Sequence, residues 1–445
     1  MSEERAYRTP FVLGKPIKNP ADFYGRSKLL RGLFQALLQS QRVAVVGEHR
    51  CGNTSVLYQL LHPEVRARHL SPAEDHSLVF VFVSCQLAGG SPGGLLRRIA
   101  VALRRADEEA DGEVDPAAVD QAWLLSYLEQ LADRHKRLVL LLDEFEVLAE
   151  LDPAFWDWFE VLANEYDVAI IASTRTDLSQ YRTEHGGPPF FNTFRSDYMG
   201  SFTPTTVDLF LRDKTELTDF DFVAVRDVIQ DLAGRFPFYM QMAAALIYVT
   251  AGGEPRLSAA QLETVQREFR SQTGKLFEDA WNKLPAPERQ ALSWLAIGEA
   301  GQGVSLSDEV LTSLERRGYL IDGRIFSSPF RDFIHQHLRH IAVDDGSARV
   351  GIHPLDLPPK ELAFLAYFTA NEGSLLSRDD IAMAVWPEHS KDAVTDAMIE
   401  KTISRLRQGL EDVEPGSGDA VESVRGHGYR LLNRPLEAGQ QSGTG

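Results

Sequence analysis

Hydrophobic residues in the first half of the chain form short continuous runs that alternate with amphipathic segments. Four runs have the length of buried strands; they are residues 43–47, 78–85, 138–144 and 168–175. Helical periodicity is clear in the segment FWDWFEVLANEY, just before the fourth run. Continuous apolar strands separated by helices are typical of a parallel sheet covered on both faces. The pattern therefore predicts an α/β fold for this half of the chain.

The pattern changes in the second half, where helical stripes are followed by short strand pairs. Helices are predicted at LPAPERQALSWLA and SDEVLTSLERRGYL, and IDGRIFSSPFRDFIHQHL then gives a short hairpin and a closing helix. This order of elements is that of a winged helix. Further on, IAVDDGSARVGI predicts a hairpin with DDG at its turn.

Composition narrows the class of protein. The chain has 445 residues, enough for about three domains. Its apolar fraction of 44% and charged fraction of 25% are those of a globular protein. Cys51 and Cys85 are the two cysteines, which gives neither a disulfide framework nor metal-ligand spacing and favours a reducing compartment. The polar N-terminus does not resemble a signal peptide, and the apolar stretch from Met242 is too short to span a bilayer. We expect a cytoplasmic protein without a membrane partner.

Candidate chemistry begins with the nine residues GEHRCGNTS, which follow the first predicted strand. Gly47 and Gly52 have the spacing of a phosphate-binding loop, G-x-x-x-x-G-K-[ST], and a predicted helix follows. Such a loop binds phosphate through backbone N–H groups, and the helix N-terminus favours anions. Thr54 or Ser55 can offer a hydroxyl to Mg²⁺. The motif predicts a site for ATP or ADP with Mg²⁺, although Asn53 occupies the lysine position.

Two further strand ends carry the residues expected of a nucleoside triphosphatase. Asp143 ends a hydrophobic strand, where the Walker B carboxylate orients the metal ion, and Glu144 can orient or deprotonate an attacking water. Arg175 ends the next strand and can report on the γ-phosphate. Taken singly, the glycine spacing is also that of a plain turn and the Asp-Glu pair that of a solvated loop. Their order along the chain favours the nucleotide-binding interpretation.

Asn53 changes what the loop is expected to do. A positive charge about 4 Å from a phosphate contributes roughly 4 kcal/mol at an effective dielectric constant of about 20, an upper-end figure. Asn53 offers only a neutral amide. The sequence therefore predicts weakened nucleotide binding and slow or absent hydrolysis, and it leaves open whether the protein is an ATPase.

The first half resembles the STAND branch of the AAA+ ATPases. The resemblance lies in FYGR ahead of the loop, the strand-terminal Asp-Glu pair, PPFFNTF after the fourth strand and GRFPFYMQ, which is similar to a G-G-x-P-Y lid motif. It implies that Gly25, Arg26 and Pro237 contact nucleotide, and that the winged helix after the lid packs on the nucleotide domain. Asn53 and Arg235 depart from the family pattern.

The last ninety residues or so resemble the OmpR/PhoB-type winged-helix DNA-binding domain. The matching motifs occur in family order: LPPKE, LLSRDDI, the VW pair, ISRLR and VRGHGYR. The resemblance implies a double-stranded DNA partner, read by the helix containing ISRLR and a wing containing VRGHGYR.

The residues of that helix agree with this interpretation. Ile399, Ile403, Leu406 and Leu410 form one apolar stripe at about 3.6 residues per turn, which leaves donor-bearing side chains on the opposite face. The predicted DNA contacts are Lys401, Ser404, Arg405, Arg407, Gln408, Arg425 and Arg430. From residue 341 onward the chain has 10 Lys and Arg against 17 Asp and Glu, so the local basic face matters more than the total. Gly409 is expected to weaken the helix by up to about 1 kcal/mol.

The predicted domains are an NTPase core, a helical lid, a STAND-type winged helix, an OmpR/PhoB-type winged helix and a disordered tail. Their boundaries are 1–180, 181–272, 273–340, 341–435 and 436–445. The leading hypothesis is a bacterial, nucleoid-associated transcriptional regulator controlled by nucleotide, by a protein partner, or both, and acting as a homodimer or tandem assembly on DNA. The alternatives are an active ATPase that assembles on DNA and a nucleotide-free protein-binding scaffold.

Overall fold

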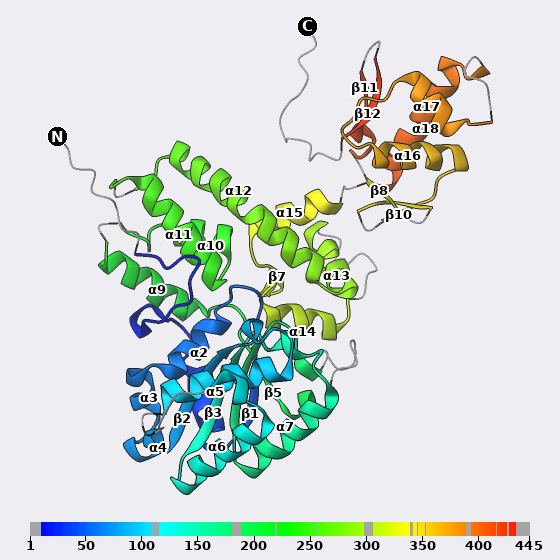
Figure 1. Cartoon of the computed structure of the whole chain (residues 1–445). Coiled ribbons are helices and arrows are strands. Elements are labelled where there is room, and N and C mark those ends of the chain that lie inside the picture. The colour runs from blue at the N-terminus through cyan, green and yellow to red at the C-terminus, as the bar shows by residue number, and fades with distance from the viewer. Residues whose placement is uncertain are drawn as a thin grey trace, which may run out of the picture. The chain divides into compact units, whose positions relative to one another are not determined.

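The computed structural model in Figure 1 divides into two compact units. The first contains residues 1–276 and 311–327, and the second contains residues 277–310 and 328–445. The residues described are 10–107, 109, 115–179, 188–218, 220–254, 256–297, 306–338, 341–344, 346–351, 353–388, 393–414, 416–424 and 427–432. The predicted tail, 436–445, lies outside them.

A five-stranded parallel sheet forms the base of the first unit. Its order is β2-β3-β4-β1-β5. The strands are β1 (Arg42–Val46), β2 (Leu78–Ser84), β3 (Arg137–Asp143), β4 (Ala169–Thr174) and β5 (Arg195–Tyr198). The four predicted strands are confirmed to within a residue or two at each end. β5 was missed, because its sequence RSDY contains no apolar run and its side chains are exposed or half-buried.

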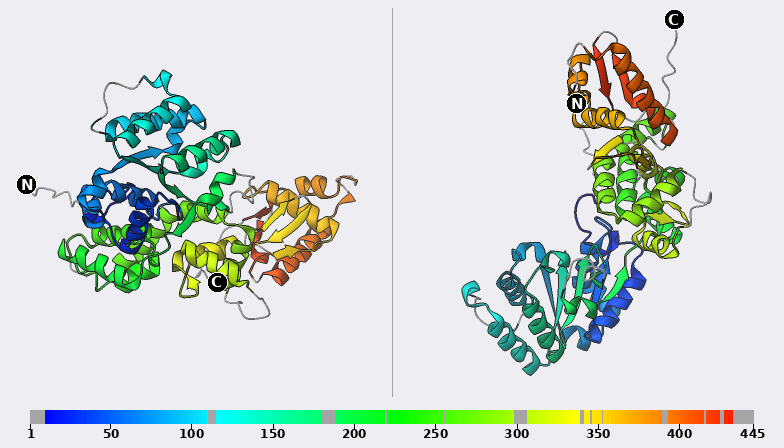
Figure 2. Two further views of the ribbon diagram at one scale, coloured as in Figure 1. Left: turned by 90° about the horizontal axis from the view of Figure 1, so that it is seen from below. Right: turned by 90° about the vertical axis from the view of Figure 1, so that its right-hand side faces the viewer.

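Helices cover both faces of this sheet, as the right-hand view of Figure 2 shows. One face packs on α5 (Pro92–Ala106), α6 (Gln121–Asp133) and α7 (Pro153–Glu165), with Trp156 and Phe159 completely buried among them. The other face contacts α1 (Ser27–Leu38) and α2 (Asn53–Leu61). Burial on both faces explains why these strands have continuous apolar runs.

A helical region follows the sheet in the first unit. It contains α9 (Pro204–Glu216), α10 (Arg226–Ala233) and α11 (Pro237–Ala251), followed by α12 (Ala259–Lys283). The hairpin of β6 (Leu320–Ile321) and β7 (Arg324–Ile325) also belongs to this unit. Shorter elements in the unit are η1 (Pro20–Asp22), α3 (Pro63–His69), α4 (Pro72–His76), η2 (Cys85–Ala88), η3 (Pro116–Ala118), η4 (Phe145–Leu148) and η5 (Pro189–Thr193).

The hairpin β6-β7 packs closely on α10 and α11. A Cβ atom added to Gly234 would lie 2.1 Å from the carbonyl oxygen of Phe326, so only glycine allows the two backbones to approach. The ring of Phe326 stacks on Tyr239 of α11 with a centroid distance of 5.7 Å. Arg235, the departure from the lid motif, has its guanidinium 3.4 Å from the carboxylate of Asp322 in the hairpin turn. The unexpected residue therefore joins the lid to the hairpin.

The second unit contains the C-terminal winged helix. The three-stranded antiparallel sheet consists of β8 (Ile341–Asp344), β9 (Ser347–Val350) and β10 (His353–Leu355). Three helices, α16 (Pro359–Ala370), α17 (Arg378–Val385) and α18 (Asp396–Val413), precede the wing strands β11 (Val421–Val424) and β12 (Gly428–Leu431). This order confirms the predicted hairpins and helices. The remaining elements of this unit are α13 (Ala286–Ile297), α15 (Ser328–Leu338) and η7 (Gly418–Ala420), and α14 (Asp308–Arg317) begins here and continues into the first unit.

The apolar stripe of α18 forms the centre of this domain's core. Ile399, Ile403, Leu406 and Leu410 are all buried, against Phe364 and other residues of α16. The wing joins the core where Tyr429 pairs with Leu376 in an isolated bridge. The stripe predicted from the sequence is therefore the internal face of α18.

Gly409 has a packing reason to be glycine. A Cβ atom at this position would lie 3.2 Å from Cδ2 of Leu357, which is closer than ordinary van der Waals contact. The helix propensity lost at Gly409 is thus accompanied by close packing of α18 on the segment before α16.

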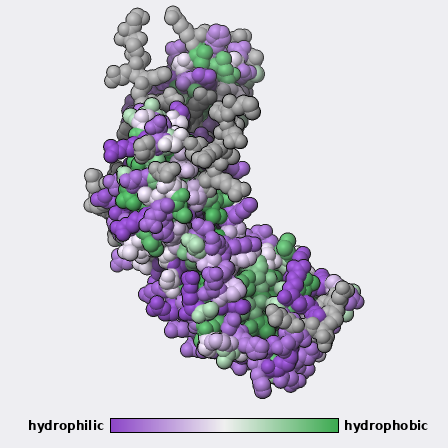
Figure 3. All heavy atoms as spheres, turned by 90° about the vertical axis from the view of Figure 1, so that its left-hand side faces the viewer, coloured by the Kyte–Doolittle hydropathy of each residue, from purple (hydrophilic) through white to green (hydrophobic). Residues whose placement is uncertain are grey.

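Hydrophilic side chains predominate on the face of the molecule shown in Figure 3, with apolar side chains in smaller groups. None of the helices in the described part of the chain is long and apolar enough to cross a membrane.

Candidate functional site

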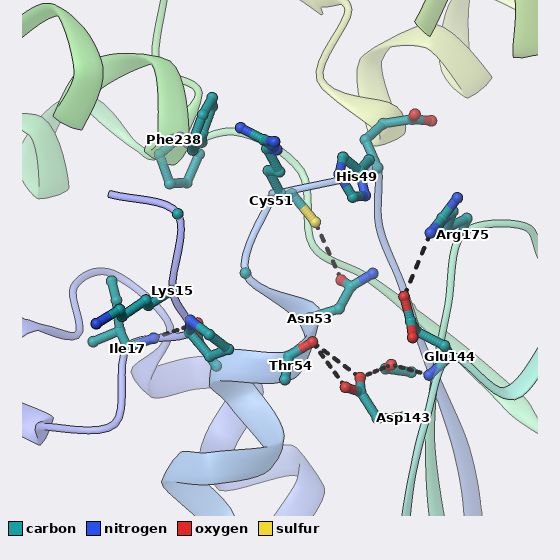
Figure 4. A pocket seen from close by; sticks show the side chains of 18 of the residues that line it. Lys15, Ile17, His49, Cys51, Asn53, Thr54, Asp143, Glu144, Arg175 and Phe238 are labelled. Carbon is teal, nitrogen blue, oxygen red and sulfur yellow. Dashed lines mark hydrogen bonds and ion pairs between the residues drawn. The ribbon is translucent and has the colours of Figure 1, made fainter. Parts of the chain in front are cut away.

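The predicted phosphate loop lies between β1 and α2 and lines a pocket of about 350 Å³ (Figure 4). Gly52 has a φ of 106°, which favours glycine. A Cβ atom at Gly47 would lie 2.3 Å from Sγ of Cys51 and 2.5 Å from Oδ1 of Asn53, so a larger residue here would displace these loop side chains. The pocket brings together most of the predicted nucleotide residues: Gly52, Asn53, Thr54, Ser55, Asp143, Glu144, Arg175 and Pro237.

Asn53 is hydrogen-bonded to the loop itself. Its Nδ2 donates to the carbonyl oxygen of Gly47 at 2.7 Å and to that of Thr174 at 3.3 Å. The thiol of Cys51 lies 3.1 Å from Oδ1 of Asn53 and donates to it. Burial raises the pKa of Cys51 to about 12, so the thiol remains a protonated donor. The residue in the lysine position therefore closes the loop and adds no positive charge.

The predicted metal side of the pocket is built from hard oxygen atoms. Oγ1 of Thr54 lies 3.0 Å from both carboxylate oxygens of Asp143. Ser173 was not singled out from the sequence, yet its hydroxyl donates to Oδ1 of Asp143 at 2.6 Å and accepts from the N–H of Glu144 at 3.0 Å. Ser173 thereby orients Asp143 and supports Glu144, whose φ of 57° is unusual for a residue other than glycine.

Arg175 lies between two acidic side chains at the same edge of the sheet. Its guanidinium nitrogens are 3.5 Å from a carboxylate oxygen of Glu144 and 3.5 Å from one of Glu146. Burial, followed by the nearby charge of Asp143, raises the pKa of Glu144. Burial also raises the pKa of Glu146. Arg175 is thus held by carboxylates in this arrangement of the pocket.

Gly25 and Arg26 pack against other parts of the first unit. Gly25 has a φ of 73°, and a Cβ atom there would lie 2.3 Å from Cγ2 of Thr206. Arg26 is 8% exposed, and its guanidinium donates to the carbonyl oxygens of Met199 and Gly200 after β5. Arg26 lines a smaller adjoining pocket of about 30 Å³, with Pro237 among the other lining residues.

Ser55 bonds away from the predicted metal position, since its hydroxyl accepts the N–H of Ile17 at 2.9 Å. In Figure 4, Ile17 and Lys15 lie on the side of the loop opposite Arg175. Of the two hydroxyls considered for Mg²⁺, Thr54 is therefore the one beside Asp143.

Two loop side chains make contacts with other elements of the first unit that the sequence did not suggest. The guanidinium of Arg50 lies over the ring of Phe238 at the start of α11, 4.6 Å from its centroid. The carboxylate of Glu48 is bonded by Arg317 and Tyr319, from the end of α14 and the residue before β6. The spacing of the loop glycines gives no signal for either contact.

The candidate DNA-binding face lies on the outer side of α18. Lys401, Ser404, Arg405 and Gln408 are exposed there, as predicted. The carboxylate of the buried Glu361 lies 3.7 Å from a guanidinium nitrogen of Arg405, and Nε2 of Gln408 donates to Asp412 at 2.7 Å.

Two other predicted DNA contacts are engaged within the domain. Arg407 donates from Nε to the carbonyl oxygen of Val421 at 2.9 Å and from NH2 to Oγ of Ser423 at 2.9 Å, so it braces α18 against β11. Arg430 pairs with Glu422 across the wing, with its Nε 2.8 Å from the carboxylate. Arg425 lies outside the described residues.

These observations define a P-loop NTPase domain joined to a winged-helix regulatory domain. Residues 17–232 match the family model described as novel STAND NTPase 1. Residues 353–431 match the one described as transcriptional regulatory protein, C terminal. The chain therefore carries a STAND NTPase domain followed by an OmpR/PhoB-type C-terminal domain, as the sequence motifs indicated.

Curated relatives and a solved structure agree with these two assignments. The chain is 32% identical over 78 residues to the transcriptional activator CadC of Escherichia coli K12, covering 18% of this chain and 15% of that protein. It is 34% identical over 80 residues to the uncharacterized transcriptional regulatory protein YvcP of Bacillus subtilis 168, covering 18% of this chain and 32% of the relative. The matches thus span less than a third of either relative.

The Walker-type ATPase of Pyrococcus abyssi has a similar fold, with a TM-score of 0.51 and 13% identity. The match covers 72% of this chain and 98% of that one. At this level of identity the likeness supports the P-loop ATPase fold and no detail of activity.

Proposed function

We propose that the protein is a DNA-binding transcriptional regulator in which a degenerate P-loop domain binds ATP or ADP, hydrolyses it weakly or not at all, and controls access to DNA. The observation that carries this proposal is that one pocket combines the Thr54–Asp143 pair with Asn53 in the lysine position. Oγ1 of Thr54 lies 3.0 Å from the carboxylate of Asp143 in this pocket, a pair that supports binding of a nucleotide with its metal ion, while Asn53 closes the loop without supplying a cation. Binding is thus supported by the loop and its helix N-terminus, and charge stabilisation of a transferring phosphoryl group is reduced.

The residues present fit Mg²⁺. The hydroxyl of Thr54 and the carboxylate of Asp143 are hard oxygen donors, and Mg²⁺ is commonly held by one or two protein groups together with substrate phosphates and water. Within the described residues, no group of three or more His, Cys, Asp or Glu side chains is arranged to hold a metal ion. Mg²⁺ bound together with the nucleotide would neutralise phosphate charge.

Glu144 and Arg175 are assigned roles that depend on one another. Glu144 would orient or deprotonate water, and its raised pKa makes the ionised carboxylate a better proton acceptor. Arg175 would exchange its carboxylate partners for the terminal phosphate of ATP. While Arg175 pairs with Glu144 at 3.5 Å, that carboxylate is partly occupied, which favours binding over turnover.

The domain boundaries that we propose are those predicted from the sequence. The core is 1–180, the lid 181–272 and the first winged helix 273–340, with the DNA-binding domain at 341–435. We infer that the nucleotide state of the P-loop domain controls the DNA-binding domain in the bacterial cytoplasm.

The test measures both ligands on the full chain. Titration calorimetry with ADP and ATP in Mg²⁺ is paired with phosphate release, and fluorescence anisotropy follows binding of a labelled DNA duplex with and without each nucleotide. The expected result is saturable nucleotide binding without turnover above background, and a DNA affinity that differs between the nucleotide states. An affinity for DNA unaffected by saturating nucleotide would contradict the proposed control.

Ser173→Ala is expected to weaken nucleotide binding in Mg²⁺ by about tenfold, the lower end for loss of a residue that orients a metal ligand. The reason is that Asp143 loses its 2.6 Å donor while both predicted metal ligands remain. Calorimetry in Mg²⁺ and in EDTA measures the effect, and binding in EDTA should change little. A uniform loss under both conditions would instead indicate a damaged loop, and Ser179→Ala, on the segment after β4, serves as the control.

Two other functions make different predictions for the same measurements. Rapid phosphate release stimulated by DNA would favour an active ATPase that assembles on DNA, of the replication-initiation or mobile-element type. Failure to bind any duplex at low salt would favour a scaffold in which the C-terminal winged helix binds a protein partner. The hydrogen bond of Asn53 to the loop argues against the active ATPase. The exposed donors of α18 argue against the protein-binding scaffold.

A further inference from the structure

Glu48 is the second residue of the phosphate loop, yet its side chain is held by a segment distant in the sequence. Nε of Arg317 lies 2.6 Å from one carboxylate oxygen, and the hydroxyl of Tyr319 donates to the other at 3.0 Å. The side chains of Arg317 and Glu48 are 18% and 14% exposed, and Tyr319 is 5% exposed. Both oxygens of this carboxylate are therefore engaged in a largely buried contact.

The segment that carries Arg317 is fixed independently of this contact. Phe326 stacks on Tyr239, Arg235 pairs with Asp322, and Gly318 approaches the backbone of Ser201. Burial, together with the charge of Glu48, raises the pKa of Tyr319 well above its ordinary value, so its hydroxyl stays a neutral donor. The contact thus consists of one cation, one neutral donor and one anion, and the segment that carries Arg317 is held in place by other contacts.

The contact between Glu48 and Arg317 affects the charge of the nucleotide pocket. Glu48 lines the same pocket as three other carboxylates and three cations, which are Asp143, Glu144, Glu146, Lys15, Arg50 and Arg175. An uncompensated carboxylate in the loop would repel phosphate, and Asn53 supplies no positive charge to offset that repulsion. Arg317 places a guanidinium directly against the carboxylate, and it does so from outside the loop.

We propose that Arg317 determines nucleotide affinity by neutralising Glu48, so that nucleotide binding and docking of the segment 311–327 on the phosphate loop favour each other. The proposal rests on nucleotide binding as the proposed function. The coupling must be reciprocal, because a segment that improves nucleotide affinity is itself held more tightly when nucleotide is bound. Segment 311–327 would in this way respond to the occupancy of the loop.

The proposal is tested by a charge-rescue series on the full chain. Affinity for ADP and for ATP in Mg²⁺ is measured by calorimetry for the wild type, Arg317→Gln, Glu48→Gln and the double variant. Arg317→Gln is expected to weaken binding by about tenfold or more, because it leaves the charge of Glu48 without its cation. Adding Glu48→Gln should restore affinity to within about threefold of the wild type, since the repulsive charge is then gone.

Two results would overturn the proposal. An affinity of Arg317→Gln within about twofold of the wild type would show that the guanidinium has no effect on the loop. A double variant as weak as Arg317→Gln would show that Arg317 acts on phosphate directly or only through folding. Tyr319→Phe keeps both charges and is expected to have the smaller effect, which separates charge from simple loss of packing.

Hydrogen exchange supplies a second measurement that does not depend on the size of the affinity change. Saturating ADP should slow exchange of residues 311–327 in the wild type, and this slowing should be lost in Arg317→Gln while β3 and β4 remain protected. Faster exchange with ADP would contradict the predicted sign.

Absence of nucleotide binding by the wild type would contradict the proposed function and is distinguishable from failure of the proposal for Arg317. If the wild type binds no nucleotide, the same four variants are made in the Asn53→Lys background. Rescue there supports the role of Arg317 although the natural loop is empty. Absence of nucleotide binding in both backgrounds overturns both proposals.

Discussion

Replacing Asn53 by lysine is expected to tighten binding of ATP in Mg²⁺ by about ten- to a hundredfold. The upper-end interaction of one charge with phosphate, roughly 4 kcal/mol, is reduced by solvent and by the loss of the amide that now bridges Gly47 and Thr174. An ammonium group can donate to the same carbonyl oxygens, so the loop should remain closed without nucleotide. Calorimetry on the full chain measures the gain in affinity.

Phosphate release distinguishes two causes of inactivity in the same variant. Turnover by Asn53→Lys would show that Glu144, Asp143 and Arg175 form a competent set from which only the lysine is missing. Tight binding without turnover would show that the pairing of Arg175 with Glu144 and Glu146 also restrains the chemistry. Asn53→Gln is the matched control, because it lengthens the side chain without adding charge; an equal gain from glutamine would contradict the electrostatic explanation.

Much of the fold could be predicted from the sequence because its strongest signals are local. Strands buried on both faces must be apolar throughout, so β1 to β4 were found from their composition. The internal face of α18 was found because Ile399, Ile403, Leu406 and Leu410 repeat at the helical period. β5 lies at the edge of the sheet and needs few apolar side chains, so its sequence gave no such signal.

The candidate site was predicted less completely, because several of its contacts join residues far apart in the chain. Ser173 orients Asp143 across neighbouring strands, and only the sheet order brings the two together. Glu48 and Arg317 are separated by 269 positions, and no motif connects them. Motifs predicted which residue types line the pocket. They could not predict which of these residues hydrogen-bond to one another.

Arg26 and Arg407 also show that a motif predicts a residue type but not the contacts of its side chain. Each belongs to a motif that implies ligand contact, and in the structure each donates to backbone carbonyl oxygens of its own domain. An arginine with a rigid set of donors can serve either purpose, and sequence spacing does not distinguish them. Burial does, since Arg26 is 8% exposed whereas the side chain of Arg405 is 63% exposed.

This distinction narrows the predicted DNA contacts to the outer face of α18. The domain as a whole is acidic, so DNA affinity must come from a few positioned donors rather than from a broad positive field. Lys401 and Arg405 are the two exposed cations on this face, one turn apart. Arg430 and Arg407 have carboxylate or carbonyl partners within the domain and should contribute less to binding.

The variant with both Lys401→Ala and Arg405→Ala is expected to bind DNA at least about tenfold more weakly at low salt. Loss of two phosphate contacts should also reduce the slope of log K against log salt concentration by about 2. Anisotropy titrations with a labelled duplex of random sequence, repeated over a range of salt concentrations, measure both quantities. A selected binding site, once obtained, should lose more affinity than the random duplex if either side chain reads a base edge.

The matched control removes the same charge from other elements of the domain. Arg349→Ala with Lys360→Ala alters β9 and the start of α16, and DNA affinity should stay within about threefold of the wild type. Equal losses in the two double variants would mean that net charge, and not the face of α18, governs binding. Normal DNA binding without Lys401 and Arg405 would instead move the interface away from α18 and favour a protein partner for its exposed face.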